Sequence, residues 1–209
     1  MFKVFFLIFE PHVAWDRIAL ARRGYAFILG TYLLPFILLD TAVEGWSLMK
    51  WGKWQSHLQI TKTFAQTTVI HFEILQAILW LAMVFVSALL LYVATESFHG
   101  RRSYLQVFST VAYGYSPLFL VNLLNVSPTM NPGVTWALGI AMTVWILYQG
   151  IPRGLKPDPT HALGIYLSAV VVVVLISGMA RVLTALYLLG LIDFQNSWLL
   201  QQIGHWLGQ

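Results

Sequence analysis

The sequence of 209 residues contains no cysteine, which excludes disulfide bonds, thiolate metal sites and cysteine nucleophiles. Charge is also scarce, because Asp, Glu, Lys and Arg make up 10% of the chain, against about 25% in ordinary soluble domains. This shortage argues strongly against a soluble fold. No basic patch with interleaved aromatic residues is present, so nucleic acid is not an expected partner.

Apolar residues, in contrast, make up 58% of the chain. A membrane-spanning helix needs about 20 mostly apolar residues, and five windows qualify. They cover residues 25–43, 70–95, 104–124, 134–150 and 163–189. Because these windows use more than half of the chain, no large soluble domain fits beside them. We therefore predict an all-α integral membrane protein with a five-helix transmembrane bundle over residues 25–190.

The two ends of the chain have the pattern of helices that lie in the membrane interface. Residues 1–24 open with a short apolar stretch that stops at Glu10 and Pro11, without the cleavage site of a secretory signal. The following residues place Trp15 among charged side chains. Residues 191–209 carry apolar side chains along one side of a helical wheel. We predict interfacial amphipathic helices at both termini.

The distribution of Lys and Arg predicts the orientation, since cytoplasmic loops carry the excess of these residues. Four of them precede the first span, two follow the second and two follow the fourth, which makes eight on one side. The loop after the first span holds three, and the other segments of that side hold none. The N-terminus is therefore predicted in the cytoplasm and the C-terminus outside.

Pro35 and Pro117 fall inside the first and third spans. Each removes a backbone N–H and crowds the carbonyl four residues back, so we expect a helix kink at both positions. Kinks are ordinary in membrane bundles, where neighbouring groups satisfy the freed carbonyl. The alternative is a broken helix that lines a substrate site, as in transporters.

Two short motifs resemble a known family. The third span contains GYSPLFL at 114–120, and LYQGIP at 147–152 closes the fourth. This combination resembles the bacterial branch of the Yip1-domain family, which consists of small five-span inner-membrane proteins with a cytoplasmic N-terminus. The resemblance extends from the region of Pro11 and Trp15 to the valine-rich fifth span. The motif residues are Gly114, Tyr115, Ser116, Pro117, Tyr148 and Gly150.

The first functional hypothesis is a non-enzymatic adaptor or organiser of the inner membrane, which binds lipids and another membrane protein or a second copy of itself. Eukaryotic relatives look like adaptors for prenylated small GTPases. This chain lacks their long cytoplasmic N-terminal region and their acidic, tyrosine-containing motif. GTPase binding is therefore doubtful.

Ionisable residues inside a bilayer are costly, which makes them candidates for function. Arg181 lies within the fifth span, and the predicted topology places Asp40 and Glu44 at the same depth in the first. His71 and Glu73 lie near that depth in the second span. Because Asp40 and Glu44 are four residues apart, they share one helix face. His71 and Glu73 are two apart and cannot both point at one place.

Three interpretations of this cluster remain open. Arg181 forms an ion pair with Asp40 or Glu73 that fixes helix packing, or the residues line a polar cavity for a lipid headgroup, an ion or a proton. The third interpretation is a metal site at His71, but a single imidazole and the absence of a known ligand spacing argue against it. The cavity supports an alternative function, namely a small oligomeric permease or channel-like protein that uses a polar outer-side cavity around Arg181.

Enzyme motifs are missing from the sequence, including the HExxH, P-loop, GxGxxG and GxSxG patterns. Ser116 precedes a proline and has no nearby histidine in the sequence that would activate it. We therefore expect no catalytic residues, no metal and no cofactor.

Overall fold

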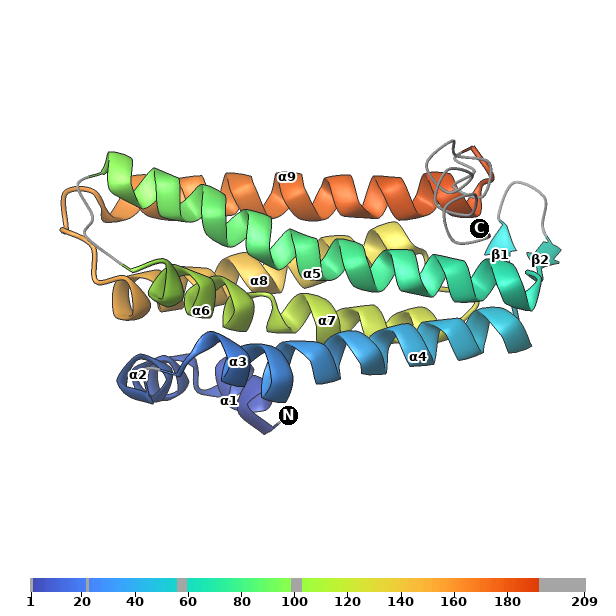
Figure 1. The fold of residues 1–209 in the computed structure, drawn as a ribbon, viewed down its shortest axis with the longest axis horizontal. Coiled ribbons are helices and arrows are strands. Elements are labelled where there is room, and N and C mark those ends of the chain that lie inside the picture. The colour runs from blue at the N-terminus through green and yellow to red at the C-terminus, as the bar shows by residue number, and fades with distance from the viewer. Residues whose placement is uncertain (1, 22, 56–59, 99–102, 192–209) are drawn as a thin grey trace, which may run out of the picture.

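The computed structural model describes residues 2–21, 23–55, 60–98 and 103–191, and it shows long helices lying side by side in a bundle (Figure 1). In the described residues, five helical stretches are long and apolar enough to cross a membrane. This confirms the predicted fold class. They cover Tyr25–Lys50, Gln66–Ser97, Tyr104–Val126, Pro132–Gly154 and Ala162–Leu188.

The helical stretches are mostly longer than the predicted windows. The first, for example, runs to Lys50 rather than to residue 43, because a helix continues through polar and aromatic residues beyond the apolar window. The predicted interfacial segment 1–24 contains two helices, α1 (Phe2–Phe9) and α2 (Pro11–Ala21). The helix predicted for 191–209 lies outside the described residues, except for Leu191.

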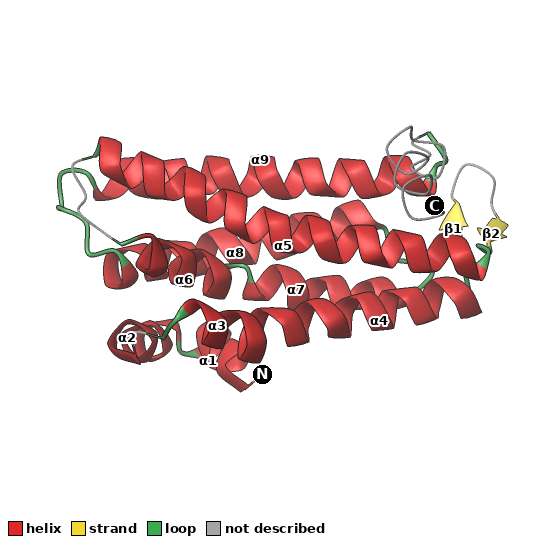
Figure 2. Ribbon diagram, in the orientation of Figure 1, coloured by secondary structure: helices red, strands yellow, loops and turns green. Residues whose placement is uncertain are grey.

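Successive spans run in opposite directions and give the bundle two different ends (Figure 2). We call the end that carries α1 and α2 the arm end. At the opposite end, strands β1 (Lys53–Gln55) and β2 (Ile60–Lys62) pair antiparallel, and we call it the hairpin end. These short strands add a small β-hairpin to the predicted helical architecture.

The first span is interrupted just before its proline. It consists of α3 (Tyr25–Ile28), a π-helical turn (Leu29–Leu33) and α4 (Leu34–Lys50). The backbone N–H of Leu34 bonds to the carbonyl of Leu29, five residues back. The π turn therefore lies at the place where Pro35 disturbs the regular i to i−4 ladder.

The third span is broken within its motif. Helix α6 (Tyr104–Gly114) ends one residue before Tyr115, and α7 (Ser116–Asn122) begins directly after it, with Pro117 in its first turn. A proline is tolerated there because the first-turn N–H groups have no intrahelical partner. A 3-10 turn, Leu123–Val126, completes the span.

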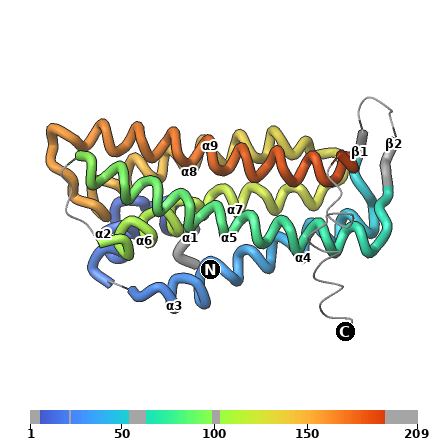
Figure 3. Tube along the Cα trace, turned by 45° about the horizontal axis from the view of Figure 1, so that its top comes forward, coloured from blue at the N-terminus to red at the C-terminus, as the bar shows by residue number. Residues whose placement is uncertain are grey.

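Helix α8 (Pro132–Gly154) packs against α2, α6, α7 and α9 (Ala162–Leu188). Its path beside α7 and α9 is visible in Figure 3. Glycines permit the close approach, since a Cβ at Gly139 would lie 2.7 Å from Cδ1 and 3.0 Å from Cα of Leu118. Helix α5 (Gln66–Ser97) and α9 pack along each other on one side of the bundle. Small residues at such crossings are the usual basis of helix association in lipid.

We predict that Gly139→Val destabilises the protein, because the new side chain collides with the backbone of α7. Overpacking of this kind costs about 1 to 3 kcal/mol. Thermal unfolding in detergent measures the effect. The matched control is Gly30→Ala, where the added Cβ meets nothing within 4 Å, and an equal loss in both variants would contradict the packing argument.

Candidate functional site

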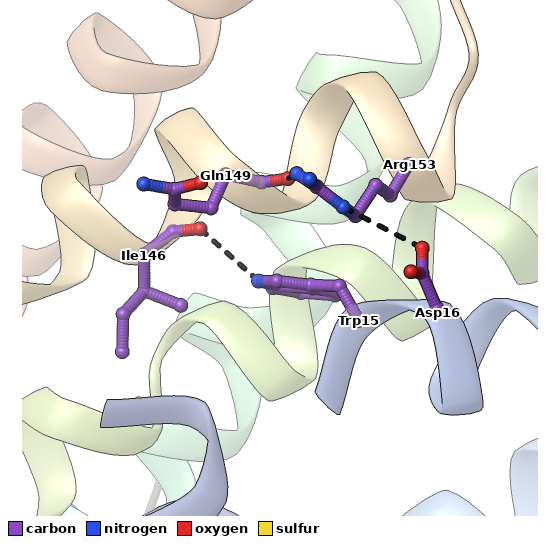
Figure 4. A network of polar contacts seen from close by, with 5 residues as sticks. All are labelled: Trp15, Asp16, Ile146, Gln149 and Arg153. Carbon is purple, nitrogen blue, oxygen red and sulfur yellow. Dashed lines mark hydrogen bonds and ion pairs between the residues drawn. The ribbon is translucent and has the colours of Figure 1, made fainter. Parts of the chain in front are cut away.

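At the arm end, α2 is fixed to α8 by a tryptophan. The side chain of Trp15 is 0% exposed, and its ring lies where a side chain at Gly150 would be. Its indole Nε1 donates a hydrogen bond to the carbonyl of Ile146 at 3.2 Å (Figure 4). The motif glycine Gly150 therefore provides the space in which the N-terminal segment docks.

A charged pair lies beside this contact. Arg153 Nε is 3.5 Å from the carboxylate of Asp16, and its Nη1 donates to the carbonyl of Gln149 at 3.0 Å (Figure 4). Asp16 is largely exposed, so the pair itself contributes little free energy, about 0 to 1 kcal/mol. It orients α2 on α8, whereas the buried Trp15 supplies the apolar contact.

The hydroxyl groups around the break in the third span bond within the bundle. The Ser116 hydroxyl bonds to the phenol of Tyr32 and donates to the carbonyl of Tyr113. The phenol of Tyr115 bonds to Ser87 at 2.8 Å. These motif side chains are buried, so they join the spans rather than line an open site.

The other motif residues have packing positions. A side chain at Gly114 would collide with Leu147, so this glycine lets α6 approach α8. Tyr148 points out of the bundle, with 56% of its surface exposed, and its ring lies 5.3 Å from that of Tyr166. The motif thus combines one close helix contact with an outward-facing aromatic residue.

Toward the hairpin end, acidic side chains are buried between α4 and α5. Asp40 is 1% exposed and Glu44 is 3% exposed. Gln76, which is 0% exposed, donates a hydrogen bond from Nε2 to Glu44 Oε2 at 2.8 Å. Glu73 packs against Gly45 of α4, where a Cβ would lie 3.0 Å from its Cγ. We call Asp40, Glu44, Glu73 and Gln76 the acidic cluster.

Polar contacts continue from this cluster to the end of the bundle. Ser47 donates to the carbonyl of Val126 at 2.5 Å, and Lys53 Nζ donates to the carbonyl of Asn125 at 3.3 Å. Thr135 donates to Asn125 Oδ1 at 2.8 Å. Burial lowers the pKa of Lys53, an effect that the nearby Glu44 opposes. The hairpin is therefore tied to the third span beside the acidic cluster.

The structure shows no direct ion pair of Arg181 with Asp40 or Glu73. Within the described residues, no carboxylate lies within 4.0 Å of its guanidinium, although Arg181 and Asp40 interact electrostatically over a longer distance. Helix α9, which carries Arg181, packs mainly against α5 and α8. His71 is exposed on α5, whereas Asp40 and Glu44 are buried.

Sequence reasoning missed Gln76, which lies in the long apolar second span and makes the buried hydrogen bond to Glu44. A single amide within such a stretch is the signal that would have identified it.

Across residues 2–21, 23–55, 60–98 and 103–191, no group of three or more His, Asp or Glu residues has the arrangement to hold a metal ion.

The five apolar helices and the buried polar contacts between them define a multi-pass membrane protein. A sequence model of the Yip1 domain matches residues 5–181. The chain therefore belongs to the Yip1 family, as the motifs in the third and fourth spans indicate. No curated protein and no solved structure matches the chain.

We predict that Gln76→Leu lowers thermal stability in detergent, because Glu44 loses the amide donor in a buried place. Removing one partner of a hydrogen bond to a charged group costs about 1 to 3 kcal/mol. Ile78→Leu, at an exposed position of the same helix, is the control and changes the melting temperature little. A Gln76→Leu variant as stable as the parent would show that this hydrogen bond contributes nothing.

Proposed function

We propose that the protein is a non-enzymatic adaptor or organiser of the inner membrane, and that its N-terminal helices bind anionic lipid at the cytoplasmic surface. The observation that carries the proposal is the docking of α2 on α8 through the buried Trp15. A segment held in this way keeps a fixed position at the arm end. It is thus a preformed surface rather than a loose tail.

The arm end is the cytoplasmic end in this proposal. The excess of Lys and Arg in the segments that flank it supports the assignment. The cytoplasmic leaflet carries anionic lipids, and each basic residue near its surface contributes about 1 kcal/mol of attraction. The hairpin end then faces outward.

Two cavities open where α2 meets the bundle. One has a volume of about 230 Å³ and is lined by Trp15, Arg23 and Gln106, among others. The second, of about 740 Å³, is lined by residues that include Arg153 and Lys156. Basic side chains beside polar and apolar walls suit a lipid phosphate whose acyl chains remain in the membrane.

The outward surface of α1 and α2 supports the same placement. Phe9 is 78% exposed and Leu20 is 83% exposed, whereas Trp15 is buried. Exposed apolar side chains next to Arg17 have the amphipathic character of a helix that lies in the membrane interface.

A second membrane protein, or a second copy of this chain, would have a helix face available on α9. Exposed apolar side chains recur there at intervals of four residues along most of the helix. These residues are Leu163, Leu167, Val171, Leu175 and Met179. Lipid or another apolar helix suits this surface equally well.

The lipid proposal predicts a selective stabilisation by phosphatidylglycerol over phosphatidylcholine. Phosphatidylglycerol added to mixed micelles raises the melting temperature of the parent protein, because a ligand that binds only the folded state stabilises it. Arg23→Gln weakens the apparent affinity about fivefold, which corresponds to the loss of about 1 kcal/mol. Trp15→Ala abolishes the selectivity, since α2 is released.

Lys50→Gln is the matched control, because Lys50 is an exposed cation at the hairpin end. This variant keeps the response of the parent protein. Equal stabilisation by both lipids, or an equal loss in Arg23→Gln and Lys50→Gln, would refute a lipid site at the arm end.

The small permease is a second candidate, favoured by the buried polar atoms of the acidic cluster that lack hydrogen-bond partners. Flux measurements in proteoliposomes distinguish the two functions. Movement of protons, common ions or small metabolites that depends on the protein would favour the permease, and its absence would favour the adaptor.

A further inference from the structure

Asp40 and Glu73 have carboxyl oxygens that are all buried without a hydrogen-bond partner. Asp40 belongs to α4, and Glu73 belongs to α5 and packs against Gly45 of α4. Negative charges on these groups would repel each other, and Glu44 would repel both. A charged carboxylate in apolar surroundings is unfavourable unless hydrogen bonds or counter-charges compensate it.

An uncharged side chain in the same cluster points independently to a missing hydrogen-bond donor. Gln76 is 0% exposed, and while its Nε2 donates to Glu44, its Oε1 has no partner. Buried polar atoms normally have partners, so each exception requires an explanation. The unpartnered atoms of Asp40, Glu73 and Gln76 are all acceptor oxygens, which a donated hydrogen would satisfy.

Asn122 places a further acceptor near this depth. Its Oδ1 is buried and has no partner, and the residue is 4% exposed. Helices α4 and α7 run in the same direction, and Ser47 meets Val126 near their ends. Asn122 therefore lies about one helical turn from that contact toward the arm end, and Glu44 lies at a similar distance from it on α4.

Neither Lys53 nor Arg181 forms an ion pair with a carboxylate of the cluster within the described residues, although both interact with it electrostatically. Lys53 donates to the carbonyl of Asn125. The segment 116–126 contributes no titratable side chain. The titratable and charged groups that these elements carry toward the hairpin end include Asp40, Glu44 and Lys50 on α4, Lys53 on β1, His71 and Glu73 on α5, and Arg181 and Tyr187 on α9.

We propose that Asp40 and Glu73 form a proton-binding site, in which protons occupy the carboxyl groups at neutral pH and exchange with water at the hairpin end. A metal ion fits this cluster poorly, because its acidic groups do not gather around one point within the described residues. A proton, unlike a metal ion, needs only one carboxyl oxygen to bind it and one acceptor for the O–H group that results. The O–H group formed on the carboxyl donates to a buried acceptor, and the negative charge disappears.

Proton release has a structural consequence. When a carboxyl O–H bond breaks and the proton passes to water, a negative charge remains between α4 and α5. Asp40, Glu44 and Glu73 then repel each other across the contact at Gly45. The proton-binding site thus makes the packing of the first and second spans at the hairpin end sensitive to pH. This inference is independent of lipid binding at the arm end.

Infrared spectroscopy of the full chain in phosphatidylcholine vesicles tests the site, because a protonated carboxyl group has a carbonyl band that shifts in heavy water. The parent protein shows this band at neutral pH and loses it on titration to alkaline pH. Asp40→Asn and Glu73→Gln each remove part of the band, and the double variant removes most of it. Glu96→Gln, at an exposed position of α5, leaves the band unchanged.

Isotope labelling gives the same answer if the variants fail to fold. Carbon-13 in aspartate shifts the Asp40 part of the band, and carbon-13 in glutamate shifts the Glu73 part. A parent protein without a protonated carboxyl band at neutral pH overturns the proposal. A band that neither label shifts, or that folded double variants retain in full, overturns it as well.

Discussion

The close approach of α8 to its neighbours is the constraint on which the arrangement of the bundle depends. Gly139 brings it onto α7, and Gly150 leaves space for the ring of Trp15 from α2. In lipid, helix association relies on van der Waals packing and hydrogen bonds rather than on removal of apolar surface from water. A side chain at either glycine would therefore push apart segments that pack closely in the structure.

The two ends of the bundle differ in chemistry. At the arm end, Trp15 and Asp16 of α2 have partners in α8, and basic side chains line the adjacent cavities. Toward the hairpin end, the carboxyl oxygens of Asp40 and Glu73 are buried without hydrogen-bond partners. Attachment to a charged membrane surface suits the first arrangement, and exchange of protons suits the second. In this proposal, a docking surface and a proton-binding site lie at opposite ends of one bundle.

The fold was largely predictable because apolar runs of membrane length leave few alternatives. The depth of Asp40, Glu44 and Glu73 also followed from the order of the spans. The lack of an ion pair between Arg181 and Asp40 or Glu73 in the described residues did not, since helical periodicity gives the face on which a residue lies but not the helix that this face contacts. The hydrogen bond of Gln76 to Glu44 required knowledge of the contact between α4 and α5, which a single sequence does not contain.

The most direct test of the account is whether α2 is docked on α8 in the membrane. Because the chain has no cysteine, Asp16→Cys and Arg153→Cys can be combined without background reactivity. A short thiol-specific cross-linker in native membranes, followed by mass spectrometry, is predicted to join the two positions. Adding Gly150→Leu is predicted to suppress the product. Absence of the cross-link in the pair, or equal yield with Gly150→Leu, would contradict the docking of the arm through Trp15.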